Sequence, residues 1–160
     1  MLQVYYRLDS DAWTLLADAL ALHGIPPLPR VERTEKEKPF FPDLPDLHFS
    51  LSHTKGACLC ALSDAPVGVD IEPILPRRES LWKHCLTPEE FSRFQAQNGG
   101  WEEFYRIWTL KEAWCKYTGE GLMHPRKWPL PPPCPHRSYF PDGFAAAVCG
   151  AEEPPDFILL

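Results

Sequence analysis

The hydrophobic pattern of the first part of the chain predicts a strand followed by a helix. Residues 3–8 are mostly apolar or aromatic, which is typical of a short strand. Residues 11–22 carry apolar side chains at helical spacing, namely Ala12, Leu15, Leu16, Ala19 and Leu22. Ser10 is suited to cap the start of this helix, and Gly24 is suited to end it.

Three further apolar segments predict an antiparallel meander. They lie at residues 47–51, 57–62 and 67–71. The first two are joined through Gly56, and a turn at residues 64–66 leads into the third. Because side chains on a strand alternate between its two faces, Asp70 and Glu72 are expected on the same face of the last strand.

Two helices are predicted in the second part of the chain. The sequence Thr87-Pro88-Glu89-Glu90 is the strongest helix start, since Thr87 is suited to cap the helix and Glu90 completes a capping box. Gly99-Gly100 is expected to end this helix. A second helix is predicted from Trp101 to Tyr117.

Proline-rich segments separate these elements. Residues 125–141 contain seven prolines and are expected to form an extended loop, followed by closing strands at 144–149 and 157–160. Residues 25–47 form a connector that carries four basic side chains, Arg30, Arg33, Lys36 and Lys38. These cations have two interpretations, either a solvated loop or a loop that faces a phosphate.

Composition and charge narrow the class of protein. The chain has 160 residues, of which 44% are hydrophobic and 24% charged, and this favours one compact soluble domain or two small halves that share a core. A formal net charge of −6 argues against a general nucleic-acid binder but permits a local basic pocket. The sequence shows no signal peptide and no apolar run of membrane-spanning length, so we expect a cytoplasmic protein without a membrane partner. The six cysteines form no C-x-x-C pair and are expected to be buried free thiols.

Three carboxylates and a lysine are the clearest candidates for chemistry. Asp70 and Glu72 share a strand face, and Glu112 and Lys116 lie one turn apart on the second predicted helix. Both pairs also have a plain structural interpretation, as solvent-exposed carboxylates and as an ordinary helix ion pair. Their apolar surroundings favour function instead, because three hard oxygen ligands on two rigid elements suit a Mg²⁺ ion that holds a phosphate.

The neighbours Ser52 and His53 are a second candidate site. Adjacent residues on a strand point to opposite faces, so this pair is not part of a catalytic triad. One interpretation is a role in capping or in the turn. The other is anion binding, in which a hydroxyl and an imidazole donate hydrogen bonds to a phosphate.

Taken in order, four stretches of the sequence resemble the phosphopantetheinyl transferases of the Sfp type. They are Lys38-Pro39-Phe40-Phe41-Pro42, Phe49-Ser50-Leu51-Ser52-His53-Thr54, Gly68-Val69-Asp70-Ile71-Glu72 and Trp108-Thr109-Leu110-Lys111-Glu112-Ala113-Trp114-Cys115-Lys116. The tail Gly119-Glu120-Gly121-Leu122 extends the last of them. Each motif alone is weak evidence, whereas four in the right order are highly specific. The resemblance covers Pro39 to Leu122.

This resemblance implies an α+β fold with two similar α/β halves in one chain, residues 1–72 and 73–160, and an active site between them. It also implies an enzyme, a holo-[acyl-carrier-protein] synthase. Such an enzyme transfers the 4′-phosphopantetheine group of coenzyme A to a serine of an apo acyl or peptidyl carrier protein and releases adenosine 3′,5′-bisphosphate. The single-chain type implies a monomer, whereas a trimeric subtype carries out the same reaction between subunits.

The resemblance assigns the metal and the chemistry to four positions. Asp70, Glu72 and Glu112 match the Mg²⁺ ligands of the family. Lys116 matches a lysine that contacts the pyrophosphate, where it can stabilise or protonate the leaving group. We expect Glu112 to accept the proton of the carrier serine, directly or through water.

Further positions are implied for coenzyme A and for the carrier. Ser52 and His53 match a pair that holds the 3′-phosphate, Lys38 matches a lysine at the nucleotide end, and Lys111 is expected to face phosphate. The cations expected near an acidic carrier protein are Arg77, Arg78 and Arg106.

Two alternatives remain open at this point. One is a non-catalytic relative that binds coenzyme A or a carrier protein, because the part before Lys38 is short for the Sfp type. In an active enzyme, Arg30 or Arg33 would compensate for the reduced adenine and phosphate pocket. The other is a Mg²⁺-dependent phosphatase or nucleotide hydrolase, although no glycine-rich phosphate loop is evident.

Overall fold

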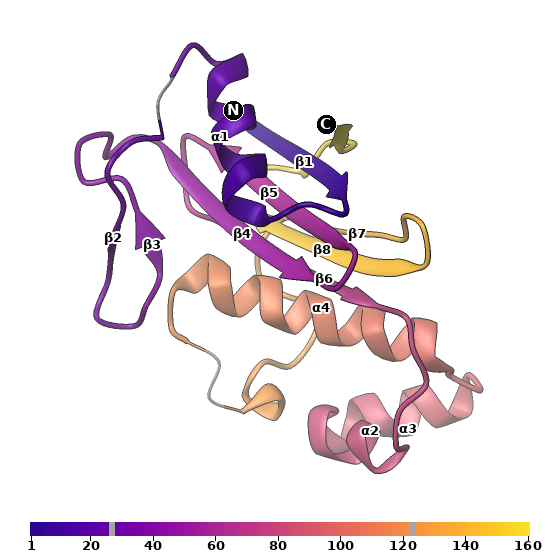
Figure 1. The fold of residues 1–160 in the computed structure, drawn as a ribbon. Coiled ribbons are helices and arrows are strands. Elements are labelled where there is room, and N and C mark those ends of the chain that lie inside the picture. Colours follow the sequence, from indigo (N-terminus) through magenta and orange to yellow (C-terminus); the bar gives the residue numbers. More distant parts are fainter. Residues whose placement is uncertain (26–27, 122–123) are drawn as a thin grey trace.

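Two β-sheets pack face to face, and each is covered on its outer side by a helix (Figure 1). The structure is a computed structural model that describes residues 1–25, 28–121 and 124–160. Leu122, the end of the last motif, lies outside the described residues. The inner faces of the sheets share one apolar core that includes Val4, Leu59 and Val69. The α+β class predicted from the sequence is therefore confirmed.

The first sheet has the strand order β4-β5-β1-β9 and carries helix α1 on its outer face. Its elements are β1 (Leu2–Leu8), α1 (Ala12–Leu22), β4 (His48–Thr54), β5 (Ala57–Ser63) and β9 (Ile158–Leu159). Strand β5 pairs antiparallel with both β1 and β4, whereas β9 runs parallel to β1. The predicted cap of α1 is wrong by one residue. Asp11, not Ser10, accepts hydrogen bonds from the backbone N–H groups of Trp13 and Thr14.

The second sheet has the order β6-β8-β7, with all pairs antiparallel. Its strands are β6 (Val67–Pro73), β7 (His136–Tyr139) and β8 (Phe144–Gly150). The predicted meander is therefore only partly right, because β4 and β5 form a hairpin but β6 pairs with β8. The prediction of a fully extended proline-rich loop also missed β7 and a short 3₁₀ turn, Pro125–Lys127.

Three helices follow β6 in the chain, and a short hairpin precedes β4. The helices are α2 (Ser80–Cys85), α3 (Pro88–Ala96) and α4 (Trp101–Thr118), and the hairpin consists of β2 (Glu32–Arg33) and β3 (Pro39–Phe40). The capping box between Thr87 and Glu90 is present as predicted. Helix α4 ends at Thr118, one residue beyond the predicted end, and is followed by Gly119, whose φ of 73° lies in the left-handed region that favours glycine. No helix in the described part of the chain is long and apolar enough to cross a membrane.

A glycine on β6 lets α4 approach the second sheet closely. A Cβ atom at Gly68 would lie only 2.1 Å from the carbonyl oxygen of Ala113, so a larger residue here would force the helix away from the strand. Side chains alternate between the two faces of a strand, so Gly68, Asp70 and Glu72 share one face of β6. The close packing at Gly68 therefore brings both carboxylates towards α4. Gly68 thus sets the distance between β6 and α4.

Two serine hydroxyls join the first sheet to the second. Ser50 and Ser52 on β4 accept hydrogen bonds from the backbone N–H groups of Val69 and Ile71 on β6, at 3.0 and 3.2 Å. Strands β4 and β6 belong to different sheets, so these side chains take the place of a backbone ladder. The candidate site lies next to this junction.

Candidate active site

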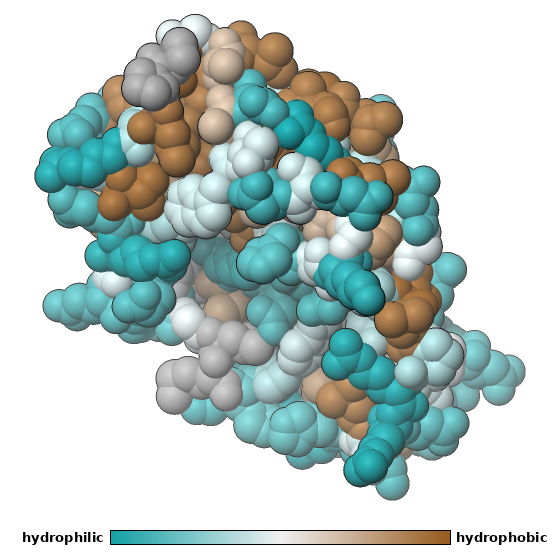
Figure 2. All heavy atoms as spheres, in the orientation of Figure 1, coloured by the Kyte–Doolittle hydropathy of each residue, from teal (hydrophilic) through white to brown (hydrophobic). Residues whose placement is uncertain are grey.

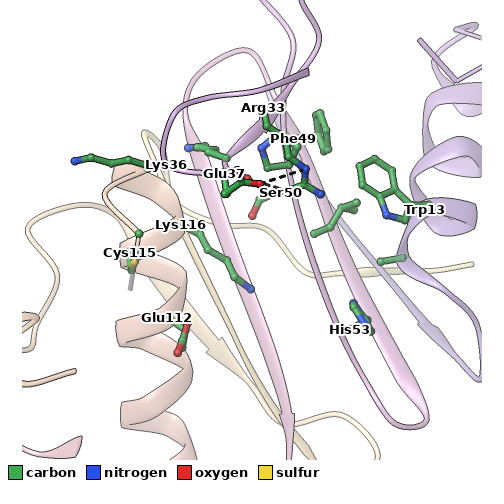
Figure 3. A pocket seen from close by; sticks show the side chains of 16 residues that line it. Trp13, Arg33, Lys36, Glu37, Phe49, Ser50, His53, Glu112, Cys115 and Lys116 are labelled. Carbon is green, nitrogen blue, oxygen red and sulfur yellow. Dashed lines mark hydrogen bonds and ion pairs between the residues drawn. The ribbon is translucent and has the colours of Figure 1, made fainter. Parts of the chain in front are cut away.

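A cavity of about 360 Å³ opens between α1, the β2–β3 hairpin, β4 and α4. The charged and polar groups of interest in its wall are Arg33, Lys36, Lys38, His53, Glu112 and Lys116. In the space-filling view, hydrophilic side chains surround a hollow on this side of the molecule (Figure 2). Figure 3 shows Glu112 and Lys116 on α4, opposite Trp13 on α1 and His53 near the end of β4. The wall thus combines four cations, Arg33, Lys36, Lys38 and Lys116, with two carboxylates, Glu37 and Glu112.

Asp70 does not line the cavity but contacts Lys116, which does, and it has one satisfied and one unsatisfied oxygen. Its Oδ1 accepts hydrogen bonds from Ser52 Oγ and from Lys116 Nζ, both at 2.9 Å. Its Oδ2 is buried and has no hydrogen-bond partner among the described residues. A buried carboxylate oxygen without a partner is costly, so this atom is suited to a further cation.

The other two carboxylates show the same shortage of positive charge. Burial, together with the negative charge of Asp70, raises the pKa of Glu112 to about 7. Burial and Asp70 also raise the pKa of Glu72, while Arg77 and Lys116 partly oppose that rise. Glu72 and Glu112 hold their protons tightly beside the carboxylate of Asp70, and a divalent cation would stabilise the charged forms of these groups.

The donor set therefore fits Mg²⁺ in its chemistry. All three side chains offer the hard oxygen atoms that this ion prefers. Within the described ranges, however, no three His, Cys, Asp or Glu side chains are close enough together to enclose a metal ion as they stand. To hold an ion together, the three carboxylates would therefore have to move closer to one another. One oxygen of Asp70 is already in contact with Lys116.

The structure gives Ser52 a different place from the one expected. Its hydroxyl donates to Asp70, accepts from the Ile71 N–H group and is buried, and the side chain does not line the cavity. This position gives no support to the expectation that Ser52 holds the 3′-phosphate. Ser52 is placed to orient Asp70, whereas its neighbour His53 is exposed and lines the cavity.

The two predicted phosphate-contacting lysines behave differently. Lys38 lines the cavity, but its ammonium donates to the carbonyl of Tyr117 at 2.9 Å, and burial lowers its pKa. Lys111 is fully buried on another side of α4, where its ammonium lies 2.6 Å from Glu90 Oε2 and also donates to the carbonyl of Pro125. Lys111 does not line the cavity. This position gives no support to the expectation that Lys111 faces phosphate.

Sequence reasoning assigned no role to Trp13, which also lines the cavity. The signal was present, because Trp13 precedes the inward positions Leu15 and Leu16 of the amphipathic helix and so falls beside the buried stripe. A tryptophan that remains 38% exposed at the edge of a cationic cavity is a candidate binding residue.

Comparisons with known proteins agree on one family. The model of the 4′-phosphopantetheinyl transferase superfamily matches residues 66–152. The chain is 31% identical over 179 residues to the 4′-phosphopantetheinyl transferase Sfp of Bacillus subtilis (strain 168), covering 96% of this chain and 79% of that protein. It is 38% identical over 93 residues to another 4′-phosphopantetheinyl transferase of Bacillus subtilis, covering 57% of this chain but only 42% of the relative. It is 39% identical over 115 residues to AcpT of Escherichia coli (strain K12), covering 68% and 58%.

Proposed function

The chain belongs to the 4′-phosphopantetheinyl transferase superfamily, and we propose that it transfers the 4′-phosphopantetheine group of coenzyme A to a serine of an apo carrier protein with the help of Mg²⁺. The family and the transferase class are those predicted from the sequence. The observation that carries the proposal is the unpartnered buried oxygen of Asp70, which lies in a carboxylate cluster beside a cationic cavity.

Asp70, Glu72 and Glu112 would hold the ion. When bound, Mg²⁺ would neutralise the diphosphate of coenzyme A and stabilise charge on the leaving group. The unpartnered oxygen of Asp70 supports this assignment, as do the raised pKa values of Glu72 and Glu112.

The transfer itself is a substitution at phosphorus. The serine oxygen of the carrier attacks the phosphorus that bears the pantetheine arm, and a new phosphate ester bond forms. The bond from that phosphorus to the bridging oxygen breaks, and its electron pair stays on the departing adenosine 3′,5′-bisphosphate. No covalent bond to the enzyme is needed.

Glu112 and Lys116 have complementary roles in this step. The carboxylate of Glu112 accepts the proton of the serine hydroxyl, directly or through a water molecule. The ammonium of Lys116 donates a hydrogen bond to the departing phosphate oxygen. Both side chains line the same cavity, and the nearby Asp70 holds Lys116 in place.

The carrier protein would approach the outer mouth of the site. Arg77 and Arg78 line a shallow surface depression together with Leu81 and His84, and Arg77 also lies beside Glu72. An acidic carrier suits these cations. Arg106 is a poorer candidate, because its guanidinium is already paired with Glu103 at 2.6 Å. We further propose a monomer, which a native mass measurement would test.

The test is transfer to a panel of apo acyl and peptidyl carrier proteins. The enzyme, coenzyme A and Mg²⁺ are incubated with each carrier, and the carrier mass is then measured. We expect at least one carrier to gain one phosphopantetheine group and Glu112→Gln to lose at least about 100-fold in rate. If no carrier gains mass although coenzyme A binds, the chain is a non-catalytic relative instead.

A further inference from the structure

Trp13 stands at the end of the cavity away from the carboxylates. It lies in the first turn of α1, where its ring packs edge to face on Phe49, with the ring centroids 6.2 Å apart and an interplanar angle of 66°. Glu112 and Lys116 lie across the cavity on α4 (Figure 3). The tryptophan and the carboxylates therefore mark two separate parts of one cavity.

The Trp13 ring is not needed to fill the core. The neighbouring α1 residues Ala12, Leu15 and Leu16 are at most 4% exposed, whereas Trp13 is 38% exposed. The edge-to-face contact with Phe49 fixes the orientation of the indole without covering both of its faces. This geometry leaves a rigid aromatic surface at the cavity wall.

The charges in the wall of the same cavity indicate what this surface would bind. Arg33 and Lys36 come from the β2–β3 hairpin region, and Lys38 lies beside them in the same cavity wall. Lys36 is paired with Glu120. Arg33 donates to the backbone carbonyl of Glu37 at 2.8 Å and lies 3.9 Å from the Glu37 carboxylate, which also lines the cavity. An aromatic face beside several cations suits a ligand that combines a planar base with phosphate groups.

We propose that Trp13 stacks on the adenine base of coenzyme A and thereby holds the nucleotide end of the donor. The inference rests on the proposed function, since it places the diphosphate at Lys116 and the carboxylates and the nucleoside at the opposite end. It adds a substrate-binding residue on α1, an element outside all four sequence motifs. Base stacking depends on an aromatic face, so the identity of residue 13 should control nucleotide affinity.

The test compares Trp13→Phe, which keeps an aromatic ring, with Trp13→Leu, which keeps an apolar side chain without one. Calorimetric titrations measure adenosine 3′,5′-bisphosphate and coenzyme A, and thermal melts confirm that each variant is folded. We expect Trp13→Leu to weaken both nucleotides by about tenfold and Trp13→Phe to weaken them less. Mg²⁺ affinity should be unchanged in both variants, because the ion site is at the other end. Phe140→Leu removes an exposed aromatic outside the cavity and is the control.

The outcomes separate this inference from the proposed function. If wild-type protein binds coenzyme A and Trp13→Leu binds it equally well, or if Leu and Phe weaken it equally, stacking by Trp13 is wrong. A wild-type protein that binds neither nucleotide contradicts the proposed function itself. A folded Trp13→Leu variant that also loses Mg²⁺ affinity would show that Trp13 maintains the shape of the cavity, which likewise overturns the stacking role.

Discussion

The ammonium of Lys116 lies 2.9 Å from Oδ1 of Asp70, and this contact links helix α4 to strand β6 in the candidate active site. The same oxygen accepts a hydrogen bond from Ser52, so three elements meet at one carboxylate. The other oxygen of Asp70 is left without a partner. The protein thus balances part of the negative charge of the cluster with its own lysine and leaves one position suited to an ion.

Ser52 and Ser50 provide a matched pair that separates stability from metal binding. Both hydroxyls accept a backbone N–H group of β6, but only Ser52 also donates to Asp70. Each alanine variant leaves a buried N–H group unsatisfied, so we expect each to lower the free energy of unfolding by about 1–3 kcal/mol. Only Ser52→Ala should also weaken Mg²⁺ binding, as measured by calorimetric titration. Equal Mg²⁺ affinity in the two variants would show that Ser52 is not part of the Mg²⁺ site.

Lys111 is predicted to stabilise the fold and not to bind coenzyme A. It is a fully buried cation paired with Glu90, which also accepts the Leu130 N–H group. Removing one partner of a buried pair leaves an uncompensated charge, so Lys111→Met should cost about 3–5 kcal/mol of unfolding free energy. The double variant with Glu90→Gln should recover part of that loss. Coenzyme A affinity, measured well below the melting temperature, should stay at the wild-type value. A selective loss of that affinity would show that Lys111 belongs to the binding site.

His53 is expected to recognise the 3′-phosphate of coenzyme A. Its side chain is exposed on β4 and lines the cavity, so it is available to a ligand. We predict that His53→Ala weakens the binding of coenzyme A more than that of 3′-dephospho-coenzyme A, by about tenfold, because one charge-assisted hydrogen bond is lost. Equal losses for the two ligands would place His53 elsewhere along the substrate.

The raised pKa of Glu112 makes the stability of the metal-free protein depend on pH. A carboxyl group whose pKa rises from 4.5 to about 7 on folding binds its proton more tightly in the folded state. Its favourable contribution is fully present below about pH 4.5 and is lost as the pH rises through 7. Relative to Glu112→Gln, wild-type protein should therefore lose melting temperature between pH 4.5 and 7 without metal. Added Mg²⁺ should restore more stability at pH 7.5 than at pH 5. Parallel melting curves for the two proteins would contradict the raised pKa.

Local patterns in the sequence predicted the elements that carry the site. Strand alternation placed Asp70 and Glu72 on one face, and helical spacing placed Glu112 and Lys116 on one side of α4. These rules are short-range and follow from backbone geometry. The motif order then identified the family, since each motif is weak evidence but their sequence along the chain is specific.

Long-range pairing decided what the sequence did not predict. Strand β6 follows β5 closely but pairs with β8, because its apolar face completes the core between the two sheets. This pairing turned Ser52 towards Asp70 and away from the cavity. The positions of Lys111 and Trp13 were likewise decided by which face of each helix packs against which neighbouring element. A single sequence does not reveal that packing.

The most direct measurement is a calorimetric titration of Mg²⁺ into wild-type protein and Asp70→Asn, each with and without coenzyme A. We predict one ion bound per wild-type chain, bound more tightly when coenzyme A is present, and a loss of both effects in Asp70→Asn. Equal Mg²⁺ affinity of the two proteins would contradict a shared site of carboxylates, ion and diphosphate. An affinity for coenzyme A that is the same with and without Mg²⁺ would contradict it as well.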